Sequence, residues 1–202
     1  MPRSKSDSRE KIVESARRLL SVQGLQGTGM AQIIAESGAP RGSTYFLFPG
    51  GKEEIAVAAV RAATADSVTF IAETRRTSRT AREWVTTMAG HFARRLEDSG
   101  FTEGLPMTTV TLDSVPGSAA LSAACHEAYE SWVTALEESL VGYGVPAQEA
   151  RGLAMLMLAT LEGGMILARA YQSLEPLELI QAQILTLLPG DRPRRETETS
   201  VP

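Results

Sequence analysis

Apolar residues recur at helical rather than alternating spacing along almost the whole chain. In the first segment, for example, Ile12, Ala16 and Leu19 fall on one face of a helix. A half-buried strand needs an apolar residue at every second position, and this pattern does not supply it. The chain has 202 residues, of which 43% are hydrophobic, so it is long enough to bury a core. We therefore predict an all-α protein.

The composition also indicates the cellular compartment in which the protein is expected. Cys125 is the only cysteine, which excludes an internal disulfide and a multi-cysteine metal site and agrees with a reducing cytoplasm. The N-terminal sequence MPRSKSDSREK lacks the apolar segment of a signal peptide. The most apolar run, 154–168, is interrupted by Glu162 and is shorter than the ~20 residues that cross a bilayer. These features predict a soluble cytoplasmic protein with no membrane partner.

Glycines and a proline delimit three helices in the N-terminal segment. The first helix begins near residue 7 and ends at Gly24, and a short second helix covers about 28–38. A third helix follows over 40–48, where Pro40 suits a first helical position because its missing N–H would be unpaired there. Two short helices joined at a glycine predict a helix-turn-helix whose second member is the recognition helix.

The first turn of this recognition helix carries little bulk. Gly42 and Ser43 allow backbone amides and a short hydroxyl to approach phosphates and base edges. Arg41 adds a forked donor that can read guanine or hold a phosphate. Residues 1–60 contain eight basic and six acidic side chains, a net charge of +2, whereas the whole chain carries −4. A mildly basic N-terminal segment, followed by an acidic remainder of the chain, agrees with binding of double-stranded DNA by the N-terminal segment.

The segment from Ile12 through Lys52 resembles the DNA-binding domain of TetR/AcrR-type transcriptional regulators. The family pattern is G-x-x-R/K-G-S/T-x-Y-x-x-F, followed by a basic residue that opens the fourth helix. The resemblance implies a homodimeric repressor that occupies a palindromic DNA operator and leaves it when a small-molecule inducer binds the C-terminal domain. Thr44 stands where the family often has leucine, so we expect it to be partly exposed. The matching residues are Gly38, Arg41, Gly42, Ser43, Tyr45, Phe48 and Lys52.

The same resemblance implies roles for individual residues. Residues 41–43 would face the groove, Tyr45 would contact a phosphate through its hydroxyl, and Lys52 would hold a second phosphate. Thr28 would lie near the DNA backbone at the start of the second helix. Phe46 has two interpretations, contact with a base methyl group or simple packing. The predicted DNA-binding residues are Thr28, Arg41, Gly42, Ser43, Tyr45, Phe46 and Lys52.

The remainder of the chain is predicted to form long helices. We expect these over about 52–76, 80–98, 118–141, 146–173 and 176–188, with a turn-rich stretch at 101–117. The predicted organisation is a helix-turn-helix DNA-binding domain (1–51), a helical ligand-binding and dimerisation domain (52–188) and a disordered tail (189–202).

Two C-terminal motifs extend the resemblance. They are W-x-x-A-L-E at 132–137 and L-E-G-G-x-x-L-A-R at 161–169. Together with FPGGKEE at 48–54, these motifs resemble the TetR subgroup that includes lincomycin-resistance and flavonoid-responsive repressors. The resemblance then covers most of the chain.

The helix near 147–173 is apolar on nearly every face, so it must pack against its own domain and against something else. Small residues on it permit the close approach of another helix. Packing within the monomer is one interpretation, and a dimeric four-helix interface is the one favoured by the resemblance. The predicted dimer-interface residues are Ala159, Gly163, Ala170, Ile180, Ile184 and Leu187.

Methionines and aromatic residues are suited to the walls of an adaptable apolar cavity, although each could also be an ordinary core residue. The predicted ligand is a small, largely apolar molecule. The predicted ligand-binding residues are Trp84, Met88, Phe92, Phe101, Met107, Tyr129, Trp132, Met155, Leu158 and Met165.

The sequence gives little support for an enzymatic site. Cys125 and His126 are neighbours, which point about 100° apart on a helix, so they do not form a nucleophile-base pair by themselves. His91 and His126 are the only histidines, too few for a convincing zinc site. We predict no catalytic residue, cofactor or metal. The alternatives are a cytoplasmic small-molecule-binding protein or small hydrolase without DNA function, and a constitutive architectural DNA-binding protein.

Overall fold

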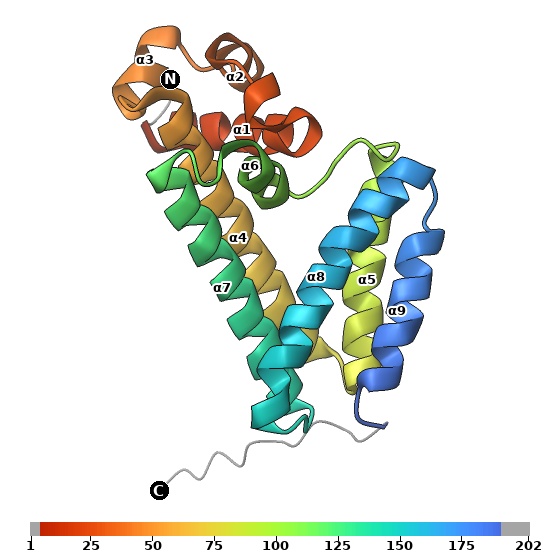
Figure 1. Cartoon of the computed structure of the whole chain (residues 1–202). Helices are drawn as coiled ribbons and strands as arrows, with labels where there is room; N and C mark the ends of the chain where they lie inside the picture. The colour runs from red at the N-terminus through yellow and green to blue at the C-terminus, as the bar shows by residue number, and fades with distance from the viewer. Residues whose placement is uncertain (1–4, 191–202) are drawn as a thin grey trace, which may run out of the picture. The chain divides into compact units, whose positions relative to one another are not determined.

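The computed structural model describes residues 5–190 (Figure 1). Within this range all regular secondary structure is helical, which confirms the predicted all-α class. The predicted tail lies outside the described residues from position 191 onward. The helices are α1 Lys5–Gly27, α2 Met30–Ser37, α3 Arg41–Leu47, α4 Gly51–Thr77, α5 Ala81–Asp98, α6 Pro106–Ser114, α7 Ala119–Gly142, α8 Ala147–Tyr171 and α9 Glu175–Leu187.

The chain forms two compact units. The first unit contains residues up to 66 and residues 102–130, and therefore α1, α2, α3, α6 and the first parts of α4 and α7. The second unit contains 67–101 and the residues from 131 onward, and therefore α5, α8, α9 and the remaining parts of α4 and α7. The predicted boundary between residues 51 and 52 falls at the start of α4, and as a functional boundary it stays a prediction.

In the first unit, α1 packs against α2, α3 and α6 (Figure 1). Ile12 and Leu20 of α1 are buried with Ile33 of α2 and with Phe48, which follows α3. The guanidinium of Arg9 lies 5.1 Å from the centre of the Phe48 ring. The amphipathic stripe predicted for the first helix therefore forms the base on which the two short helices rest.

Gly24, where we predicted the first helix to end, interrupts α1. Its backbone has φ 70° and ψ −178°, and one more turn of chain follows it to Gly27. Residues other than glycine rarely adopt such a positive φ. An added Cβ at Gly24 would also lie 2.5 Å from Oδ2 of Asp113. The backbone angle and the nearby carboxylate both require glycine at this position.

Helix α6 lies within the stretch that we predicted as turns, so that prediction was wrong. Pro106 occupies the first turn and is buried, together with Met107 and Val110. The hydroxyl of Thr109 donates a 2.8 Å hydrogen bond to the carbonyl of Leu20 in α1. Threonine is a poor helix former and short helices depend on packing, so the contact with α1 provides stability that local sequence does not.

In the second unit, α9 packs against both α8 and α5 (Figure 1). Trp84 of α5 is fully buried, and its Nε1 donates to the carbonyl of Ile71 at 3.4 Å. The hydroxyl of Tyr143 donates to the carbonyls of Arg75 at 3.1 Å and Ser78 at 3.3 Å. The first bond joins α5 to α4, and the bonds of Tyr143 join the residue after α7 to the end of α4.

Two helices, α4 with 27 residues and α8 with 25, are long and apolar enough to cross a membrane by length and composition alone. The sequence argument from a short apolar run therefore does not hold for α8. Core helices of soluble proteins satisfy the same criterion. The expected absence of a membrane partner consequently stays a prediction.

Candidate DNA-binding surface and ligand cavity

The recognition helix α3 is anchored by its inner face. Gly38 ends α2 in the left-handed conformation, with φ 61°, and Pro40 is the residue immediately before α3. Thr44 is completely buried, and its hydroxyl lies 3.3 Å from the carbonyl of Pro40. The expectation that Thr44 is partly exposed was wrong. Its methyl group packs inward and its hydroxyl has a local backbone acceptor, so burial leaves no polar atom unpaired.

The outer face of α3 is exposed. Arg41, Gly42, Tyr45 and Phe46 lie at i, i+1, i+4 and i+5, and therefore share one side of the helix. Tyr45 is 44% exposed and Phe46 is 70% exposed, so the packing interpretation of Phe46 does not hold within this chain. The guanidinium of Arg41 lies 5.9 Å from the centre of the Tyr45 ring. Ser43 is half-buried at the edge of this face.

The other two predicted DNA-binding residues lie at the turn between α1 and α2, residues 24–28. Thr28 is 1% exposed, and its hydroxyl donates to the carbonyl of Gly24 at 2.6 Å. The half-buried Lys52 donates from Nζ to the carbonyl of Leu25 at 3.0 Å. Thr28 therefore closes the turn with its side chain, whereas the ammonium of Lys52 has two further hydrogens.

Asp113 of α6 supports the same turn. Its Oδ2 accepts hydrogen bonds from the backbone N–H groups of Leu25, at 2.7 Å, and Gln26, at 3.1 Å. Both N–H groups follow the break at Gly24, where regular helical acceptors are lost. A carboxylate from a distant part of the sequence thus takes the place of a local cap.

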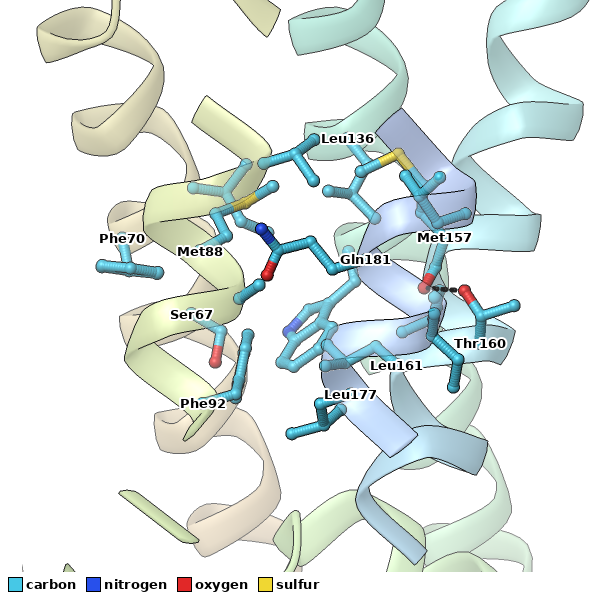
Figure 2. A pocket seen from close by; sticks show the side chains of 17 residues that line it. Ser67, Phe70, Met88, Phe92, Leu136, Met157, Thr160, Leu161, Leu177 and Gln181 are labelled. Carbon is cyan, nitrogen blue, oxygen red and sulfur yellow. Dashed lines mark hydrogen bonds between the residues drawn. The ribbon is translucent and has the colours of Figure 1, made fainter. Parts of the chain in front are cut away.

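The second unit contains an apolar cavity that is partly open to solvent. Seventeen residues of α4, α5, α7, α8 and α9 line it. Figure 2 shows Phe70, Met88 and Phe92 across the cavity from Met157 and Leu161. Cavities that bind small molecules are mostly apolar, with a few polar groups in the wall. The lining of this cavity is therefore suited to a small, largely apolar molecule.

Four predicted ligand-binding residues line the cavity: Met88, Phe92, Trp132 and Leu158. The other six do not. Trp84 and Met165 are buried in the core, and Met155 is 46% exposed. Phe101 is half-buried after α5, whereas Met107 and Tyr129 belong to the first unit. Sequence alone does not distinguish a methionine or an aromatic residue in the cavity wall from one in the core.

Thirteen lining residues were not predicted as ligand contacts. Most are aliphatic, and their helical spacing identifies a buried face without indicating that the face borders a cavity. Phe70 was the one additional aromatic residue that composition could have indicated. The unpredicted residues are Ser67, Phe70, Ile71, Val85, Ala89, Leu136, Met157, Thr160, Leu161, Leu177, Ile180, Gln181 and Ile184.

An apolar stripe remains exposed along α8. It contains Leu156, Ala159, Gly163, Ile166 and Ala170, spaced alternately by three and four residues. Leu156 and Ile166 are 43% and 52% exposed, and an added Cβ at Gly163 would meet nothing within 4 Å in the chain. These residues form what we call the α8 stripe.

The predicted dimer-interface residues divide between two faces. Ala159, Gly163 and Ala170 belong to the α8 stripe, and Leu187 of α9 is 53% exposed. In contrast, Ile180 and Ile184 line the cavity, and Ile184 is only 6% exposed. Ile184 is thus buried within its own chain and Ile180 is half-buried, and as interface residues both stay predictions.

Two family profiles together match most of the chain. The profile described as bacterial regulatory proteins of the tetR family matches residues 12–59, and that of the LmrA/YxaF-like C-terminal domain matches residues 81–183. The chain belongs to the TetR family. It is a DNA-binding transcriptional regulator of the LmrA/YxaF-like subgroup, as the sequence motifs predicted.

Individual relatives agree with this placement. The HTH-type transcriptional regulator LmrA of Bacillus subtilis (strain 168) is 36% identical over 92% of this chain and 98% of its own length. YxaF of the same organism, an uncharacterized regulator, is 33% identical over 92% and 97%. A TetR regulator structure from Legionella pneumophila shares the fold, with a TM-score of 0.80 at 20% identity over 94% of this chain and 100% of that one.

Proposed function

We propose that this TetR-family regulator is a homodimeric repressor that binds a palindromic operator and is released by a small, largely apolar molecule. The observation that carries the proposal is the apolar cavity in a regulator that also exposes a recognition helix. Its expected location is the cytoplasm, where both DNA and the small molecule are accessible.

The proposed DNA contacts are the exposed face of α3 and its flank. Arg41 is suited to bidentate recognition of guanine, and Tyr45 to a phosphate contact. Phe46 is exposed and can contact a thymine methyl group. Lys52 keeps its proposed phosphate contact through its remaining hydrogens. Thr28 is left out of this surface because its side chain is buried.

Replacing Arg41 should separate specific from general DNA binding. We expect Arg41→Ala to weaken the operator complex by about 1–3 kcal/mol and to relax preference at one base pair in each half-site. Lys52→Ala should weaken operator and random DNA alike and flatten the salt dependence. Fluorescence anisotropy at several salt concentrations, with operator selected from genomic fragments, measures both effects.

A charge-matched control is available in the same unit. Arg61 is exposed and pairs with Glu127 at 3.1 Å, away from α3 in the sequence. Arg61→Ala removes the same charge and should leave base preference unchanged. Thermal unfolding must accompany Lys52→Ala, because this lysine also bonds the Leu25 carbonyl. Equal losses on operator and random DNA for Arg41→Ala and Lys52→Ala would contradict the assigned roles.

The proposed homodimer buries the α8 stripe. Only 33% of the most apolar 18-residue window of α8 is buried within the chain, so much of its apolar surface has no cover there. Exposed apolar surface of this extent typically marks an interface. A two-fold dimer presents two copies of α3, and therefore favours an operator that is an inverted repeat.

Ligand and operator should bind antagonistically. Helix α4 belongs to both units and offers a continuous route for coupling. If a ligand weakens operator binding, the operator must weaken ligand binding by the same factor, typically equivalent to about 1–3 kcal/mol. Titrating an active compound against free protein and against the operator complex measures this factor. Equal affinities would show binding without release.

A hydrolase function is less well supported. Cys125 is buried, and burial raises the pKa of its thiol, which disfavours the reactive thiolate. Within residues 5–190 no group of three or more His, Cys, Asp or Glu side chains is placed to hold a metal. A ligand-binding protein without DNA function would leave the exposed face of α3 without a role. Operator selection with purified protein distinguishes these alternatives.

A further inference from the structure

One residue of the cavity wall carries a buried polar atom without a hydrogen-bond partner. Trp132 of α7 lines the cavity and is 2% exposed. Its indole Nε1 is buried and has no hydrogen-bond partner in the part of the chain that the structure describes. A buried donor without an acceptor costs about 1–3 kcal/mol, and native proteins rarely leave one unpaired. An acceptor on a molecule bound in the cavity that Trp132 lines would remove this cost.

Other polar groups of the wall are already engaged with the protein. The hydroxyl of Thr160 donates to the carbonyl of Leu156 at 2.8 Å. The amide nitrogen of Gln181 lies 3.4 Å from the Thr86 hydroxyl. Trp84 is a useful contrast, because its Nε1 donates to Ile71 and it does not line the cavity. The N–H of Trp132 therefore differs from Thr160 and Gln181 in lacking a partner, and from Trp84 in both pairing and position.

The wall also carries no formal charge. None of the described lining residues is Asp, Glu, Lys or Arg. His91 packs against the lining residues Phe70 and Phe92, with ring centres 4.3 Å and 5.3 Å away. Burial, reinforced by Arg95 and Arg94, lowers the pKa of His91, so its imidazole is neutral at neutral pH. A charged ligand would lose its hydration without gaining an ion pair.

We infer that the ligand is an uncharged, largely apolar molecule with a hydrogen-bond acceptor, such as a carbonyl oxygen, that binds Nε1–H of Trp132. This inference deepens the proposed function and rests on the cavity as its ligand site. Trp132 is then the residue that selects ligands with an acceptor over hydrocarbons of the same shape. The apolar wall supplies affinity, and the indole N–H supplies orientation.

Matched pairs of compounds test this selectivity on the full-length protein. Benzophenone and diphenylmethane differ by a carbonyl in place of a methylene, as do 9-fluorenone and fluorene. Equilibrium dialysis gives the Kd of each compound, and the ratio of hydrocarbon Kd to ketone Kd isolates the acceptor. We expect Trp132→Phe to lower this ratio about fivefold to tenfold. Trp84→Phe, the matched control, should leave the ratio unchanged.

A second test measures the indole N–H resonances of the unsubstituted protein by NMR. The chain has two tryptophans, so the ¹⁵N-labelled protein gives two indole N–H resonances, which the two variants assign. The ketones should shift the Trp132 resonance downfield, and the hydrocarbons should not. An unchanged ratio in Trp132→Phe, equal shifts with ketone and hydrocarbon, or no binding of either pair would each overturn the inference.

Operator binding distinguishes failure of this inference from failure of the proposed function. A ratio that falls in Trp132→Phe, with operator affinity unaffected by any bound compound, supports the Trp132 contact and contradicts ligand-induced release. Operator release by both members of a pair, with an unchanged ratio, supports release and contradicts the Trp132 contact.

Discussion

Gly163→Leu should separate the dimer while leaving the protomer folded. The Cβ of a residue added at this position would have no neighbour within 4 Å in its own chain, so we expect the protomer to accommodate the leucine. In the proposed dimer each protomer would place one such leucine in the packed interface. Overpacking costs about 1–3 kcal/mol per site, so two copies should weaken association by about 2–6 kcal/mol. Sedimentation equilibrium measures the dimer, and operator binding should weaken with it.

The adjacent glycine provides the matched control. An added Cβ at Gly164 would lie 2.8 Å from Cδ1 of Ile180 and 2.9 Å from Cδ2 of Leu177. Gly164→Leu should therefore disturb the packing of α8 on α9 and lower the free energy of unfolding of the protomer. Thermal unfolding at several protein concentrations separates the two effects, because dimer dissociation alone depends on concentration. An unchanged dimer for Gly163→Leu would place the interface elsewhere.

Gly24→Ala should be among the most destabilising substitutions in the first unit. Alanine resists the φ of 70°, and its Cβ would meet the Asp113 carboxylate, which two backbone N–H groups hold in place. We expect a loss of about 2–4 kcal/mol in the free energy of unfolding. Asp113→Ala should cost about 1.5–3 kcal/mol, because a charged acceptor is lost. Urea denaturation measures both values.

A double-mutant cycle tests the contact between these two residues. In the Gly24→Ala, Asp113→Ala double variant the clash is removed, so the combined loss should be smaller than the sum of the single losses. Gly90→Ala in α5 is the control, because its added Cβ has only ordinary contact with a flexible arginine. It should be neutral or stabilise by up to about 1 kcal/mol. Strict additivity of the two single losses would contradict the proposed contact.

Local patterns in the sequence were sufficient for the helix-turn-helix. The break at Gly24, the end of α2 at Gly38 and the start of α3 after Pro40 follow from backbone preferences of glycine and proline, which act within a few residues. The family pattern then indicated α3 as the recognition helix. Helix α6 lacks such signals, because its stability comes from packing on α1, far away in the sequence.

By itself, then, the sequence determined the all-α class, the recognition helix and the family, because helical period, turn chemistry and short motifs are local properties. Only the tertiary structure decided which apolar residues border the cavity and which remain exposed. Neighbours in α8 show the difference: Leu156 is exposed, whereas Met157 lines the cavity. In α9, Ile184 likewise lines the cavity, whereas Leu187 is exposed. A helical period identifies residues that share a face, but the neighbouring helices decide what that face contacts.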